Sequence, residues 1–159
     1  MELYHLTIKQ FIAKMNETTS TNDKVDIMRF CHESVQKTLY YTYNKYIQFN
    51  ITPKVLEKIA DLCNKHTKFK DSQDIFSLLD SLNYKMLTGH NAIKEVNGFL
   101  RFNKEYKDIL YLILDRNLKI RVSSKLINKA IPGLIPEFNV ALANQYNEKT
   151  KKKISLEKD

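Results

Sequence analysis

The residues best suited to chemistry lie between Arg116 and Pro136, in the sequence RNLKIRVSSKLINKAIPGLIP. This stretch has no Asp or Glu, and its cations are Arg116, Lys119, Arg121, Lys125 and Lys129. A window of one charge sign this long indicates a contact surface for a polyanion. The competing interpretation, that these lysines only solvate the outer face of an amphipathic helix, is weakened by the absence of acids.

A short helix is expected within this basic stretch. Ser123 is its predicted N-cap, because a serine hydroxyl can accept from the free backbone N–H groups of a first helical turn. At about 100° per residue, Lys125, Asn128 and Lys129 share one face. The opposite face is apolar and carries Leu126, Ile127, Ala130 and Ile131. The pattern predicts one side for the core and one side for phosphate.

A second candidate phosphate site is the predicted helix start Thr88-Gly89-His90-Asn91-Ala92. Its side chains are small or polar, and the first backbone N–H groups of a helix favour anions. An ordinary N-cap with no ligand is the alternative for this segment.

The elements that position these residues are predicted to be helices of a single compact bundle. A chain of 159 residues with three Gly, three Pro and 43% hydrophobic residues suits one all-α domain. Apolar side chains at helical spacing predict helices over residues 3–17, 23–32, 34–46, 53–66, 72–83, 88–100, 103–114 and 124–131. The run Leu110–Leu114 predicts the central helix, and a polar tail follows residue 143.

Charge and motifs narrow the possible functions. Six of the eight net positive charges lie in residues 101–159, so the C-terminal third is expected to face the anion. No apolar run approaches the roughly 20 residues of a membrane span, and no signal peptide is apparent, which predicts a cytoplasmic protein.

No phosphate-binding glycine loop or catalytic constellation is apparent in the sequence. Cys31-His32 and Cys63-Asn-Lys-His66 offer zinc-ligand types, but we interpret the two cysteines as packed, metal-free thiols.

A function in another class is kept as the alternative: a small helical adaptor that binds a replication protein through an apolar, tyrosine-rich surface. Gln36, Leu39 and Tyr43 partly match a peptide that binds sliding clamps, although Thr42 stands where an aromatic residue is expected. A sliding clamp is therefore a weak candidate partner.

Three blocks of sequence resemble the N-terminal DNA-binding domain of ATP-dependent DNA ligases, especially those of tailed bacteriophages. The blocks are Leu87–Ile93, Arg116–Ser123 and Ile127–Pro136, and the spacing between them matches as well. The resemblance implies a helical domain that grips nicked duplex DNA through the minor groove and backbone, for nick sealing in replication and repair.

The resemblance also implies which residues face DNA. Thr88, Gly89, His90, Asn91 and Lys94 are expected near the phosphates of one strand. The second DNA-facing element is expected to include Arg116, Asn117, Lys119, Arg121, Ser123, Lys125, Asn128 and Lys129. The family usually has Gly at the position of Arg121, so this chain departs from the pattern there.

The same resemblance predicts two parts, a DNA-binding domain at residues 1–139 and a linker or start of a nucleotidyltransferase domain at 140–159. The adenylated lysine of the family, in a Lys-x-Asp-Gly motif, does not occur in this chain. We therefore expect no catalytic residue and no cofactor in this chain, which should be inactive alone. The parent ligase would use ATP and Mg²⁺, and the catalytic domains would act in cis.

Overall fold

The computed structural model describes residues 4–136, and within that range all regular secondary structure is helical, which confirms the predicted all-α fold. The elements, in chain order, are α1 (Tyr4–Glu17), α2 (Thr21–Arg29), α3 (Glu33–Tyr43), α4 (Pro53–Lys58), the 3-10 helix η1 (Ser72–Asp74), α5 (Ile75–Asn83), α6 (Gly89–Phe102), the 3-10 helix η2 (Lys104–Tyr106), α7 (Lys107–Leu114) and α8 (Ser124–Ala130). The predicted division at residue 139 lies outside the described residues.

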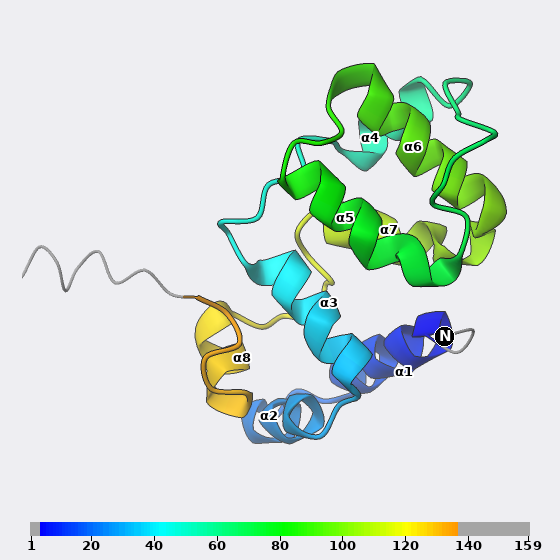
Figure 1. Cartoon of the computed structure of the whole chain (residues 1–159). Helices are drawn as coiled ribbons and strands as arrows, with labels where there is room; N and C mark the ends of the chain where they lie inside the picture. Colours follow the sequence, from blue (N-terminus) through cyan, green and yellow to red (C-terminus); the bar gives the residue numbers. More distant parts are fainter. Residues whose placement is uncertain (1–3, 137–159) are drawn as a thin grey trace, which may run out of the picture.

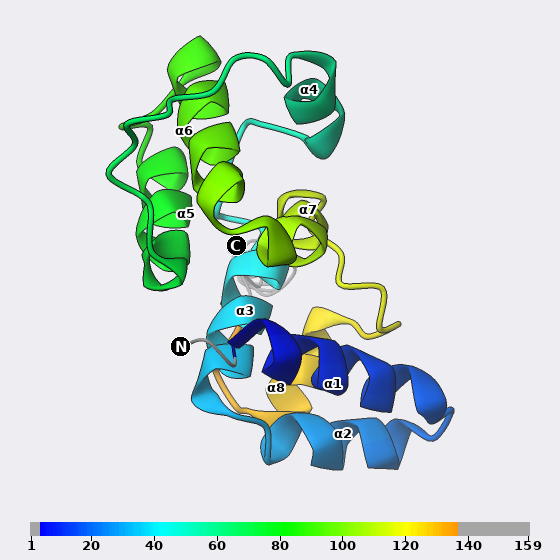
Figure 2. The same ribbon diagram turned by 90° about the vertical axis from the view of Figure 1, so that its right-hand side faces the viewer.

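The helices form two groups that share one core. Figure 1 shows α1, α2, α3 and α8 in the lower half of the molecule and α4, α5, α6 and α7 in the upper half. In the lower group α2 packs on α8, and α1 packs on α2 and α3, while α4 and α5 pack on α6 above. Contacts of α7 with α3 and α1 join the groups, as the side view in Figure 2 shows.

Helix α7 has the central position that its apolar run predicts. Ile109, Leu110, Ile113 and Leu114 are all buried, and α7 contacts helices of both groups. The buried hydrophobic side chains make one cluster that extends from Ile8 in α1 to Ile135 after α8. The helices that position the basic stretch therefore belong to the same cooperative core.

Helices α2 and α3 differ from their predicted limits. Helix α2 begins two residues earlier than expected, because Ser20 is the N-cap and its Oγ accepts from the N–H of Asp23. It ends at Arg29, and His32 instead caps α3. Helix α3 ends at Tyr43, three residues early, because the guanidinium of Arg116 binds the carbonyls of Asn44 and Ile47 in the segment that follows.

Helix α4 is also shorter than predicted. Thr52 is its N-cap, accepting from the N–H of Val55 at 3.4 Å, but the helix ends at Lys58 rather than near residue 66. The amide of Asn97 in α6 donates to the carbonyls of Ile59 and Leu62. These side-chain bonds hold the chain out of helical geometry, so that Cys63 lies in a loop and is only half-buried.

A glycine on α6 allows this loop to approach closely. A Cβ added to Gly98 would lie 2.5 Å from the carbonyl oxygen of Asn64. The carboxylate of Glu95, one turn earlier, accepts from the side chains of Asn64 and Thr67. The middle of α6 is thereby tied to the loop, which fixes the direction in which the start of α6 points.

Candidate nucleic-acid interface

Residues 117–121 form a loop whose side chains alternate between core and solvent. Leu118 and Ile120 are fully buried, whereas Asn117, Lys119 and Arg121 are exposed. The two buried side chains hold the loop against the core while its polar residues face outward. The predicted basic turn is therefore a strip with a fixed backbone.

Hydrogen bonds from distant helices hold this strip in place. Lys24 in α2, only 6% exposed, donates its ammonium to the carbonyls of Ile120 at 3.0 Å and Arg121 at 3.4 Å. The hydroxyl of Tyr43 accepts from the N–H of Leu118 at 3.1 Å, and burial raises the pKa of this tyrosine. Sequence reasoning missed Lys24, although its position beside Val25 and four residues before Met28, both buried, marks an inward-facing site.

The exposed cations of the strip have an unusual backbone conformation. Lys119 has a φ of 61° and Arg121 a φ of 57°, in the left-handed region. This region costs about 1–2 kcal/mol for a residue with a Cβ, whereas glycine adopts it freely. The N–H of Lys119 donates to Oδ1 of Asn117 at 2.8 Å, which offsets part of that cost. The conformation gives a physical reason why glycine would suit position 121.

Arg116 has an internal role instead of an outward one. Its guanidinium donates to the carbonyls of Thr42, Asn44 and Ile47 and lies over the ring of Phe49. Partial burial lowers the pKa of this arginine. Its donors are engaged in ordering the segment after α3, so we do not count it among the groups available to phosphate.

Helix α8 has the two faces that its sequence predicts. Ser123 caps it, accepting from the N–H of Leu126 at 3.2 Å, and Ile127 and Ala130 are buried. Lys125 and Lys129 are exposed.

Asn128 is the exception on the polar face of α8. Its side chain donates to the carbonyl of Ile135 and accepts from the N–H of the same residue, both at 2.9 Å. The amide of Asn128 therefore fastens the chain after α8, and Lys125 and Lys129 are the exposed cations of this helix.

The start of α6 is open to solvent. Thr88 is the N-cap without a side-chain cap hydrogen bond, and Gly89 has a φ of +56° with open space where a Cβ would lie. Thr88, Gly89, His90 and Asn91 are all exposed, while Lys94 is half-buried. These residues lie on the first two turns of α6. In Figure 1 the start of α6 lies in the upper half of the molecule and α8 in the lower half, so the two predicted DNA-facing elements are apart.

The structure gives no support to the partial match to a clamp-binding peptide. Leu39 is fully buried in the core, and the Tyr43 hydroxyl is bonded to the basic strip. Leu39 cannot enter a pocket on another protein while the domain stays folded.

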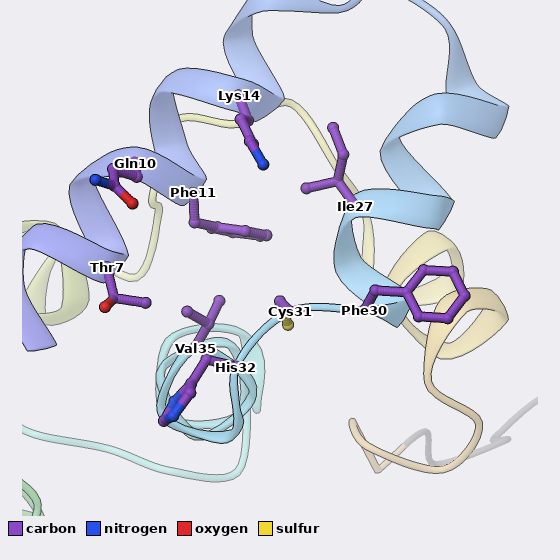
Figure 3. Close-up of a pocket in the computed structure, with 9 residues that line it drawn as sticks. All are labelled: Thr7, Gln10, Phe11, Lys14, Ile27, Phe30, Cys31, His32 and Val35. Atoms are coloured by element: carbon purple, nitrogen blue, oxygen red, sulfur yellow. The ribbon is translucent and has the colours of Figure 1, made fainter.

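A separate groove of about 270 Å³ lies between α1, α2 and the start of α3 (Figure 3). Phe11, Ile27 and Val35 line its apolar part, and Lys14 and His32 are among its polar residues. Burial raises the pKa of Cys31, also in the lining, to about 11, so this thiol is neutral at physiological pH. The groove holds no activated nucleophile.

Among residues 4–136 no group of three or more His, Cys, Asp or Glu side chains is placed to hold a metal ion. No helix in that range is long and apolar enough to cross a membrane.

Comparison with known proteins supports a relationship to DNA ligases. No family model matches the chain. The chain is 29% identical over 119 residues to the DNA ligase of Enterobacteria phage T4 and equally to that of Enterobacteria phage T6. The matched region is 74% of this chain and 24% of each ligase, so the chain spans about a quarter of the length of these relatives.

Proposed function

We propose that this chain is the DNA-binding part of an ATP-dependent DNA ligase and holds nicked duplex DNA while other parts of the ligase seal the nick. The observation that carries the proposal is the strip at residues 117–121, where buried anchors fix the backbone and cations face outward. Preorganised donors bind phosphate without the cost of ordering a loop. The similarity to the phage ligases supports duplex DNA as the polyanion.

In this proposal the groups at one strand are Lys119, Arg121, Ser123, Lys125 and Lys129, with Asn117 beside them. The groups at the other strand are Thr88, Gly89, His90, Asn91 and Lys94. Arg116 and Asn128 support the backbone from within. Contacts of this kind go to phosphate and sugar, so they position the protein in the minor groove without reading the bases.

The proposed role of this chain within ligation is to hold the DNA while other domains carry out the chemical steps. Sealing would require adenylation of a lysine, transfer of AMP to the 5′-phosphate of the nick, and attack by the 3′-hydroxyl. The residues assigned to DNA above supply cations, polar side chains and backbone donors. Their contribution is to hold the two ends of the broken strand in line for a catalytic domain of the same ligase.

Binding to labelled duplexes, followed by fluorescence anisotropy, tests the proposal. Five cations are assigned to phosphate: Lys94, Lys119, Arg121, Lys125 and Lys129. The log of the association constant should therefore fall with the log of salt concentration at a slope of about −4 to −5. Two unrelated duplexes of equal length should bind with similar affinity. Absence of binding, or a slope near zero, would contradict the proposal and favour the protein-binding adaptor.

A further inference from the structure

Two large apolar side chains project into solvent immediately before the start of α6. Tyr84 is 69% exposed and Met86 is 73% exposed, in the turn that joins α5 to α6 at the upper left of Figure 1. Lys85 lies between them and is also exposed. Two exposed apolar side chains two residues apart, beside a candidate binding surface, form a small apolar patch, and such patches mark interaction sites.

The turn that carries the pair has a fixed backbone. The N–H of Tyr84 donates to the carbonyl of Asp80 at 2.8 Å, and the N–H groups of Met86 and Leu87 donate to the carbonyl of Ser81 at 2.9 and 3.2 Å. Lys85 has a φ of 61°, the left-handed conformation that ends a helix and reverses the chain. The two apolar side chains therefore project from an ordered turn.

The charge around the pair favours a polyanionic partner. No acid occurs from Tyr84 to Lys94, a segment that contains two lysines and one histidine. The carboxylates that flank this segment are held against the fold by neutral donors, which orient them without cancelling their charge: Asp80 accepts from the Tyr41 hydroxyl at 2.6 Å, and Glu95 accepts from Asn64 and Thr67. An apolar pair within such a surface has the composition of a minor-groove contact, where basic residues bind phosphate and apolar ones enter between bases.

We propose that Tyr84 and Met86 form an apolar wedge that enters the minor groove at the nick and gives this chain a preference for nicked over intact duplex. The inference rests on the proposed function and adds the basis of nick recognition to it. Opening a base step costs a few kcal/mol in a continuous duplex. A break in one strand removes part of the backbone restraint, so the wedge enters at lower cost there.

The test compares Tyr84→Ala/Met86→Ala with the wild-type chain, all 159 residues long, on a nicked duplex and on an intact duplex of the same sequence. The double variant should lose about tenfold in affinity for nicked duplex, with a smaller loss on intact duplex, so that the ratio of the two affinities falls toward one. The salt slope should be unchanged, because neither side chain is charged. Phe30→Ala removes an equally exposed aromatic ring, 79% exposed at the end of α2, and should change neither affinity.

A second readout reports the wedge directly. With 2-aminopurine placed beside the nick, binding of the wild-type chain should raise its fluorescence by unstacking it, and the double variant should bind without that rise. An unchanged ratio of the two affinities would overturn the wedge. Equal losses on both duplexes would leave the pair as a DNA contact with no preference for a nick, and no loss on either would leave it as a surface for a partner other than DNA. If the wild-type chain binds neither duplex, the proposed function itself fails, and the wedge fails with it.

Discussion

The ammonium of Lys24 donates to the backbone carbonyl of Ile120 at 3.0 Å, although the two residues are 96 positions apart in sequence. The lysine is buried, and the residue whose carbonyl it binds is fully buried. A side chain of α2 therefore supports the strip on which we propose that DNA lies. Its effect on binding would be indirect, through the position of the strip.

Replacing Lys24 with methionine tests this support. Lys24→Met keeps a long apolar stem but leaves the carbonyl of Ile120 without its donor, so the free energy of unfolding should fall by about 1–3 kcal/mol in urea denaturation. Affinity for duplex should also fall, although Lys24 is not on the proposed surface. Lys9→Met removes an exposed lysine of α1 and should leave both quantities unchanged. Unchanged stability in Lys24→Met would contradict the supporting role.

The exposed lysines of the strip and α8 should govern the salt dependence of binding. Lys119→Ala/Lys125→Ala should weaken binding to every duplex by a similar factor and flatten the salt slope by roughly two units, with the fold intact by circular dichroism. Lys65→Ala/Lys68→Ala removes the same charge from exposed positions outside the proposed surface. Equal losses in the two double variants would mean that only net charge matters and that the DNA is placed wrongly.

Substitution of two arginines of the same stretch should affect the free energy of unfolding to different extents. Arg121→Gly removes an exposed cation and relieves a positive φ, so the free energy of unfolding should stay within about 1 kcal/mol of wild type while the salt slope flattens by about one unit. Arg116→Met leaves three carbonyls without their donor, and its stability should fall by at least about 3 kcal/mol. Similar thermal unfolding midpoints for the two variants would show that the guanidinium of Arg116 has no structural role.

The thiol of Cys31 should react slowly with an alkylating reagent. Its pKa, raised by burial from 9.0 to about 11, lowers the thiolate fraction at pH 8 by about a hundredfold. Alkylation of a Cys63→Ser variant, followed by mass spectrometry, should be correspondingly slow in buffer and become fast in urea. The rate in buffer should rise as the pH increases from 8 toward 11. Equal rates in buffer and urea would show that the groove does not shield Cys31.

The parts of the structure that depend on residues close together in sequence were predictable from the sequence. The predicted Ser123 cap, which accepts from an N–H three residues away, is confirmed. The apolar face of α8 likewise follows from helical periodicity. Features of this kind depend only on residues within a short window of the chain, so a short window is enough to predict them.

The parts that depend on the tertiary fold were not predictable in this way. Arg116 reads as a free cation in sequence, but a carbonyl that it binds belongs to Thr42, 74 residues away. The early end of α4 depends in the same way on Asn97 in α6. A single sequence shows which donors exist, whereas their partners become known only when the helices are packed.

The alternation of the strip limits which changes of its sequence the fold can accept during evolution. Leu118 and Ile120 face the core, and Asn117, Lys119 and Arg121 face outward, so direction is set by odd and even position. Exchange of one outward residue for another leaves the core untouched. Deletion or insertion of a single residue would instead turn the cations inward and the aliphatic side chains outward. The strip therefore tolerates substitution at its outward positions better than it tolerates any one-residue change in length.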